Sequence, residues 1–220
     1  MWRANSFWRI AMCVLCLLLA CALAAPALLA QERLTGVLDL SEAEKAQVLS
    51  GFLEWTPPGG ATRAELPEKV MNLAHLPTVN SQGQLGICGS FAVYYYLKTY
   101  YEAKAKGWGG RPNPATTPER VFSPAWGVLS APHGVKGTGE TSEPEGASPL
   151  RAIEAISASG ALTWAEMPYS DNASVASEDK FYRQLPSVAQ MKQALRYKGQ
   201  PGVILNNINS TGGFQALKQF

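Results

Sequence analysis

Two residues of this sequence, Cys88 and Gln82, have types and a spacing that suit nucleophilic chemistry. Cys88 lies at the start of a predicted helix, where backbone amides and the helix dipole lower the pKa of a thiol toward the reactive thiolate. Gln82 comes six residues earlier, in a segment that Gly83 and Gly86 allow to fold tightly. Its amide and the backbone N–H of Cys88 can form an oxyanion hole. The pair therefore predicts attack on a carbonyl group.

The helix that positions Cys88 is predicted over 88–104. This stretch has no proline and, after Gly89, no glycine, and aromatic residues surround most of its circumference. Such a pattern is typical of a central helix that is buried on several sides. Lys104 and Lys106 lie at its carboxyl end, where the helix dipole favours them.

Further helices are predicted from their capping signals. Capping boxes at Ser41–Glu44 and Ser187–Gln190 predict helices over 42–54 and from 188 onward. Ser-Pro pairs at 123–124 and 148–149 predict two more, the second ending at Gly160. The helix after Ser187 has one apolar face, made of Val188, Met191, Ala194 and Leu195.

Little strand is predicted before the end of the chain. Residues 130–147 are predicted to form a long functional loop, and 203–205 form the clearest strand. Helices first and strands last indicate an α+β fold. The 220-residue length suits one domain with a short extension, and 46% apolar and 16% charged residues exclude disordered and coiled-coil classes.

Residues 1–30 have the pattern of a secretory signal peptide: two arginines, an apolar run from Ile10 to Leu23, then small residues. Cleavage after Ala24, Ala27 or Ala30 fits equally. The alternative is a lipoprotein signal with a lipid anchor at Cys21. A membrane span is disfavoured because the run is shorter than the ~20 residues that a span needs. The sequence favours a cleaved signal and an exported protein, extracellular or periplasmic.

Removal of residues 1–30 leaves Cys88 as the single cysteine and lowers the formal net charge from +2 to zero, because two arginines and no acids are lost. No disulfide can then form within the chain, and one cysteine with two distant histidines cannot build a metal site. A chain with no excess of basic residues gives no indication of nucleic-acid binding. Residues 31–64 are predicted to be an N-terminal extension, which is either an inhibitory prosegment or a docking helix.

The segment Gln82–Ala92, with the sequence QGQLGICGSFA, resembles the active-site segment of the papain-like cysteine peptidases, as found in their bacterial members. The resemblance covers about 65–220, with further similarity at 66–79, 122–126, 145–149, 160–169 and 191–220. It implies a peptidase domain over 65–220 with a two-lobe fold, a helical left lobe followed by the beginning of a β-rich right lobe. It also implies Cys88 as nucleophile, Gln82 as oxyanion-hole side chain, and a backbone edge at Glu145 and Gly146 that binds substrate.

The motif departs from the family pattern at three positions. Leu85 stands where the family has a disulfide cysteine, Gly89 where an aromatic residue usually follows the nucleophile, and Ile87 where a small residue is common. These departures change the local packing but remove none of the named catalytic groups.

The family's catalytic histidine is expected roughly 130–150 residues after the cysteine, at or beyond Phe220. Of the two histidines present, His133 is predicted to lie in an exposed loop and His75 in the entry segment, and neither is predicted to be the base. The resemblance therefore implies a C-terminally truncated peptidase that acts on a peptide or protein without a cofactor. The alternatives are a non-catalytic peptide-binding protein that retains the cleft, and a lipid-anchored envelope protein in which Cys88 is merely buried.

Overall fold

The computed structural model describes residues 37–55, 73–136, 143–171 and 180–205. The chain divides into two compact units, Met1–Arg33 and Leu34–Phe220, and every described residue belongs to the second. Some sequence predictions fall outside the described residues: the signal peptide over 1–30, and the parts of the family resemblance at 66–72 and 206–220.

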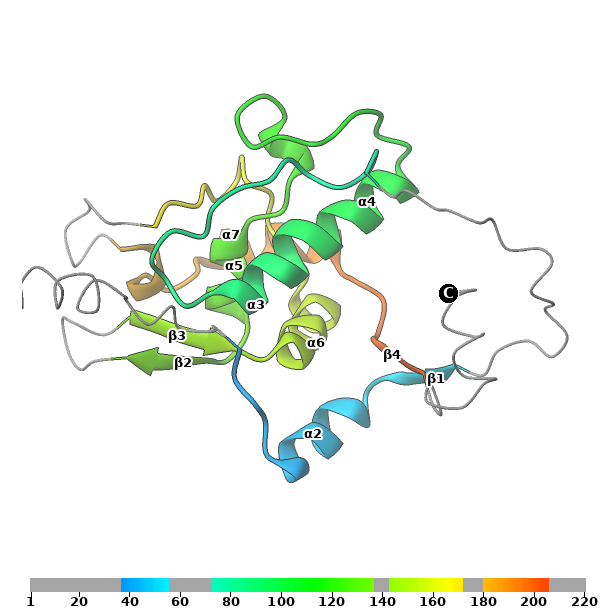
Figure 1. The fold of residues 1–220 in the computed structure, drawn as a ribbon, viewed down its shortest axis with the longest axis vertical. Coiled ribbons are helices and arrows are strands. Elements are labelled where there is room, and N and C mark those ends of the chain that lie inside the picture. Colours follow the sequence, from blue (N-terminus) through cyan, green and yellow to red (C-terminus); the bar gives the residue numbers. More distant parts are fainter. Residues whose placement is uncertain (1–36, 56–72, 137–142, 172–179, 206–220) are drawn as a thin grey trace, which may run out of the picture. The chain divides into compact units, whose positions relative to one another are not determined.

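The predicted helix after Cys88 is confirmed as a run of three helical segments, α3 (Cys88–Ser90), a π-helical segment (Phe91–Lys98) and α4 (Thr99–Ala105) (Figure 1). We call Cys88–Ala105 the central helix. Its π-helical middle is a feature that the sequence does not predict, since π-helix is rare and has no composition of its own.

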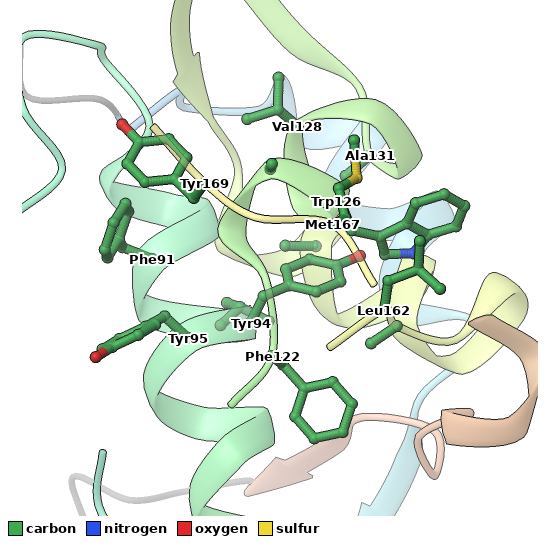
Figure 2. Close-up of a cluster of buried hydrophobic side chains, with 14 of the residues drawn as sticks. Phe91, Tyr94, Tyr95, Phe122, Trp126, Val128, Ala131, Leu162, Met167 and Tyr169 are labelled. Atoms are coloured by element: carbon green, nitrogen blue, oxygen red, sulfur yellow. The ribbon is translucent and has the colours of Figure 1, made fainter. Parts of the chain in front are cut away.

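The central helix is buried by two helices that pack against it, α5 (Pro124–Ser130) and α6 (Pro149–Ser159). Tyr94 and Tyr95 have no exposed surface. Figure 2 shows Tyr94 directed into a cluster with Phe122, Trp126 and Leu162 of the surrounding elements. Gly127 in α5 is required by this packing, because a Cβ atom there would lie 2.5 Å from the Tyr94 ring. The expectation of a helix buried on several sides is confirmed.

Helices α5 and α6 begin where the sequence predicts, but only one of the two serines caps its helix with a hydrogen bond. The Ser123 hydroxyl accepts a hydrogen bond from the backbone N–H of Ala125, whereas the Ser148 side chain makes no capping bond. Helix α6 ends at Gly160, where φ is 77° and a Cβ atom would collide with the carbonyl oxygen of Ala194. Only glycine suits that combination of backbone angle and close approach.

The prediction of a long loop over 130–147 is wrong for the residues described there. Strands β2 (His133–Lys136) and β3 (Glu143–Ala147) pair as an antiparallel hairpin with an irregularity between His133 and Val135. The two strands are too short and too rich in proline and glycine to show an alternating pattern, so their pairing comes from tertiary contacts. Strands are therefore not confined to the end of the chain.

The N-terminal extension contains α2 (Glu42–Leu49) and β1 (Leu53–Trp55). The capping box of Ser41 and Glu44 is confirmed, but the helix ends five residues before the predicted position at 54. Strand β1 pairs in parallel with β4 (Val203–Leu205), which confirms the predicted strand and supplies the partner that the local sequence did not reveal.

Helix α7 (Val188–Ala194) begins at the predicted capping box of Ser187 and Gln190. Short 3-10 helices complete the described elements, at Pro118–Arg120, Phe181–Arg183 and Leu195–Tyr197. The mixture of helices with small two-stranded sheets is consistent with an α+β fold.

Candidate active site around Cys88

Cys88 is the first residue of the central helix, as the sequence predicts, and it is partly buried. Burial raises the pKa of its thiol, while hydrogen bonds from the backbone N–H groups of Gly89 and Cys88 lower it by less, so the pKa lies above the ordinary value. The expected lowering is therefore wrong for this arrangement. The sulfur loses more solvation than the helix amides return.

Gln82 lies in a tight turn ahead of the helix. Its side-chain Nε2 donates a hydrogen bond to the Leu85 carbonyl, 2.9 Å away, which fixes the amide within the turn. A primary amide has two N–H donors, so a second hydrogen is available for another acceptor. Gly83 follows with φ of 65°, a left-handed conformation that glycine adopts without strain. The glycine role inferred from the sequence is confirmed at this position.

The predicted substrate edge lies beside the segment that leads to Cys88. Gly86 and Glu145 form a parallel bridge, and the Gly146 N–H donates to the Gly86 carbonyl at 2.6 Å. A Cβ atom on Gly86 would stand 3.3 Å from the backbone of Glu145 and Gly146. The structure thus brings these two predicted segments together, and it also occupies the Gly146 N–H with a bond inside the protein.

The glycine that follows Cys88 is explained by a second close approach. A Cβ atom on Gly89 would lie 2.7 Å from the carbonyl oxygen of Ala147, the last residue of β3. A large side chain at this position would need the strand to move. Gly89 thus takes the place of the family's aromatic residue because β3 lies too close for a larger side chain.

Residues of the N-terminal extension reach the same strand. Val37 forms a parallel bridge with Ala147, and the Leu38 N–H donates to the Ala147 carbonyl at 3.3 Å. A Cβ atom on Gly134 would lie 3.2 Å from the Leu38 side chain, so Leu38 packs on β2 as well. The end of β3 is therefore covered by the extension on one side.

Both histidines are partly buried, and the surroundings of His133 differ from expectation. His133 is not in an exposed loop, because it lies in β2, paired with Ala147, and is half-buried. Its ring Nδ1 lies 3.4 Å from the Ala131 carbonyl. His75 is also half-buried and packs edge-on against Tyr100, with ring centroids 6.1 Å apart.

One residue of the site was missed by sequence reasoning. The Tyr169 hydroxyl donates a hydrogen bond to the Gln82 carbonyl, across 87 positions of sequence. Tyr169 lies within 160–169, which the sequence distinguished only as a part of the family resemblance, and nothing there indicated a hydroxyl directed at the glutamine.

No group of histidine, cysteine or acidic residues suited to a metal ion occurs among the described residues. Within the same ranges, no helix is both long and apolar enough to cross a membrane.

Comparisons with known proteins give a structural match. No protein-family model matches the sequence, and no curated protein does. The fold is similar to that of xylellain, a cysteine protease from Xylella fastidiosa, with a TM-score of 0.52 and 19% sequence identity. The match covers 86% of this chain and 66% of the xylellain chain, so this chain spans just under two thirds of the length of its neighbour. The described fold is therefore similar to that of a bacterial cysteine protease.

Proposed function

We propose that this protein is a thiol-dependent peptidase of the papain-like type, with Cys88 as its nucleophile. The observation that carries the proposal is the position of Cys88 at the first residue of a buried central helix, in a fold similar to that of a cysteine protease. The two-lobe arrangement of that family belongs to the proposal, with β4 as the first strand of the β-rich lobe.

In the proposed reaction, the Cys88 sulfur attacks the carbonyl carbon of a peptide bond, and the carbonyl electrons move onto the oxygen. The Gln82 amide and the Cys88 N–H donate hydrogen bonds to that oxyanion. Collapse of the intermediate expels the amine, which takes up a proton, and water then hydrolyses the thioester. A base must remove the thiol proton before attack, and the same proton can pass to the departing amine; the raised pKa of Cys88 lowers the fraction of thiolate that is present without such a base.

Substrate binding is proposed at the backbone of Glu145 and Gly146. The adjacency of Gly86 to this edge supports the assignment, because it places the edge next to the segment that ends at Cys88. Because the Gly146 N–H already donates to the Gly86 carbonyl, an extended peptide would pair with other backbone groups of this edge, as in strand addition to a sheet. The proposed substrate is therefore a peptide or an unfolded protein segment.

The test is hydrolysis of fluorescently labelled casein by the full chain and by Cys88→Ser. We expect slow cleavage by the wild-type protein and none by the variant, because a serine hydroxyl in this position is a much weaker nucleophile. Cleavage that persists in Cys88→Ser would refute the assignment. Binding of casein without cleavage by either protein would favour the alternative, a non-catalytic peptide-binding protein.

The thiol itself is tested by the rate at which iodoacetamide alkylates Cys88, measured against pH on the peptide that contains it. A thiol with a raised pKa gives a rate that keeps rising above about pH 8.5. A plateau that persists below about pH 6 would contradict this result and would reveal a base paired with Cys88.

For the N-terminal extension, we propose the role of a prosegment rather than that of a docking helix. The hydrogen bond from the Leu38 N–H to the Ala147 carbonyl favours this choice, because it occupies backbone next to the proposed substrate edge. The variant Leu38→Pro removes this N–H, and Leu38→Ala retains it. A peptidyl epoxide should label Cys88 faster in Leu38→Pro than in Leu38→Ala. Equal labelling with a lower melting temperature would indicate a docking role instead.

Export is proposed from the pattern of residues 1–30 alone. N-terminal sequencing of the protein recovered outside the cytoplasm should give a start after Ala24, Ala27 or Ala30. A start at Cys21 that carries lipid would replace the cleaved signal with a lipoprotein anchor.

A further inference from the structure

The turn that presents Gln82 is attached to a distant part of the chain, and the Tyr169 side chain makes one of the contacts. The Tyr169 hydroxyl lies 2.5 Å from the Gln82 carbonyl oxygen and donates a hydrogen bond to it. Within the turn, the Gln82 side chain donates to the Leu85 carbonyl. The backbone and the side chain of Gln82 are thus fixed by two separate hydrogen bonds.

Tyr169 is itself fixed by the aromatic core. Its ring packs edge-on against Phe91, Trp164 and Phe181, with centroid separations of 5.1, 6.0 and 5.7 Å, and the residue is only 9% exposed. Figure 2 shows Tyr169 next to Phe91, which belongs to the central helix three residues after Cys88. The core that buries the central helix therefore also supports the hydroxyl that binds the turn.

Asp171 gives the same segment a second contact with the turn. A Cβ atom on Gly83 would collide with the Asp171 Cβ, so the Asp171 side chain lies directly over the Gly83 backbone. The two contacts come from residues two apart and act on consecutive residues of the turn. A turn held in this way keeps one backbone orientation.

We propose that Tyr169 is a positioning residue for the oxyanion hole, which it serves by orienting the peptide group of Gln82 and hence the side-chain amide. This inference rests on the proposed function, since it assigns Gln82 the role of oxyanion donor. Tyr169 acts through Gln82 and has no contact with the substrate in this scheme. An oxyanion donor is effective when its direction is set before the charge develops.

The Tyr169 hydroxyl remains protonated and so remains a hydrogen-bond donor. Burial raises its pKa, and the negative charge of Asp171 raises it further, well above the usual tyrosine range. The hydroxyl therefore keeps its proton, and the hydrogen bond to Gln82 persists at every pH at which the protein would work.

The test uses reversible addition of the peptide aldehyde N-acetyl-Leu-Leu-argininal to Cys88. The sulfur bonds to the aldehyde carbon and the thiol proton passes to the former carbonyl oxygen, so no leaving group is required. Oxyanion-hole donors bind that oxygen. Affinity is measured on the full chain as protection of Cys88 from iodoacetamide, and the unprotected alkylation rate reports the thiol alone.

Four proteins are compared: wild type, Gln82→Ala, Tyr169→Phe and Tyr94→Phe. Tyr94 is the matched control because its hydroxyl also makes one hydrogen bond from the same core, to the Ser130 hydroxyl at 2.8 Å. We expect aldehyde affinity to fall about fivefold in Tyr169→Phe, the equivalent of one ordinary hydrogen bond, and not at all in Tyr94→Phe. The direct alkylation rates should agree in all four.

A double variant separates positioning from general loosening. If Tyr169 acts through Gln82, then Tyr169→Phe causes no further loss of aldehyde affinity in a Gln82→Ala background. If the losses of aldehyde affinity add in the double variant, or if Tyr169→Phe alone leaves the affinity unchanged, the positioning role of Tyr169 is overturned. Gln82 would then still be the oxyanion donor. Equal affinity in wild type and Gln82→Ala, or no protection of wild type, would instead overturn the proposed oxyanion hole and with it the role of Tyr169.

Discussion

The sequences of the central helix and of α7 both contain apolar faces, but the two faces differ in how far they are buried. In the central helix, Tyr94 and Tyr95 have no exposed surface. In α7 and the turn that follows it, Val188, Met191 and Leu195 are 67%, 49% and 49% exposed. The predicted apolar face of α7 is thus covered only at Ala194, whose exposure is zero.

The difference teaches that a periodic pattern reports an apolar face but not the element that will cover it. The central helix meets α5 and α6 within the described residues. Helix α7 is attached instead through its backbone, since the Ala161 N–H donates to the Ala194 carbonyl at 3.1 Å. Substitutions in the two regions should therefore differ in their effect on the free energy of unfolding.

The largest expected loss of stability comes from Trp126→Ala in α5. Trp126 is 2% exposed, and its ring Nε1 donates to the Gly160 carbonyl at 3.1 Å. Removal of the ring leaves a cavity and a buried carbonyl without that donor, which should cost about 3–5 kcal/mol. Urea denaturation measures the change, and a loss below about 1 kcal/mol would show that the core is less tightly packed than described.

A smaller loss is expected from Gly127→Ala, the neighbouring position. The new methyl group would lie 2.5 Å from the Tyr94 ring, and overpacking of this kind costs about 1–3 kcal/mol. The same denaturation experiment applies. Gly109→Ala is the control, because a Cβ atom there meets nothing within 4 Å. Equal stability of the two variants would contradict close contact between α5 and the central helix.

The next prediction concerns a partly buried charge, Glu102, on the central helix. Burial pushes the pKa of Glu102 up, but hydrogen bonds and charges from Lys98 and Lys106 lower it overall. A carboxylate whose pKa is lowered by folding stabilises the fold at pH values above 4.5, the ordinary pKa of the group. That contribution disappears as the pH falls through the lower pKa of the folded protein.

Glu102→Gln should therefore lose stability at pH 7 and show a shallower decline on acidification below 4.5. Glu119→Gln is the matched control, since Glu119 pairs with Arg120 at 3.5 Å with most of its side chain exposed. Thermal melts recorded from pH 7 to about pH 3 report both proteins. Parallel curves for wild type and Glu102→Gln would exclude the proposed contribution of the ion pair.

The smallest effect is expected for Met191→Ala on α7. With half of its surface already in water, its truncation should change stability by no more than about 0.5 kcal/mol. A loss of 2 kcal/mol or more in the urea experiment would mean that another part of the protein covers this face, and the contrast with the central helix would then disappear.

Sequence reasoning succeeded where one short segment contains all the necessary information. The capping boxes at Ser41 and Ser187, the stop at Gly160 and the helix after Cys88 each follow from local chemistry. The hairpin at 133–147 and the pairing of β1 with β4 did not, because each depends on a partner strand whose sequence carries no matching pattern.

The candidate site divides along the same line. The sequence predicts Cys88, Gln82 and the edge at Glu145 and Gly146 as site residues, and the structure brings the edge next to the segment that contains the other two. The direction of the Cys88 pKa shift depends on burial, which the position of a cysteine at a helix start does not reveal. The support from Tyr169 depends on a contact across 87 positions.

The π-helical segment Phe91–Lys98 has a consequence for comparison with relatives. Its solvent-facing positions, Ala92 and Leu97, are five residues apart, which is wider than the repeat of an α-helix. Suppose that a relative has an ordinary α-helix at this place. Its sequence would align with this chain on both sides of the segment only if the alignment contained a one-residue gap inside the helix. We therefore expect the alignment to lose register just after the nucleophile, even where the two backbones superpose.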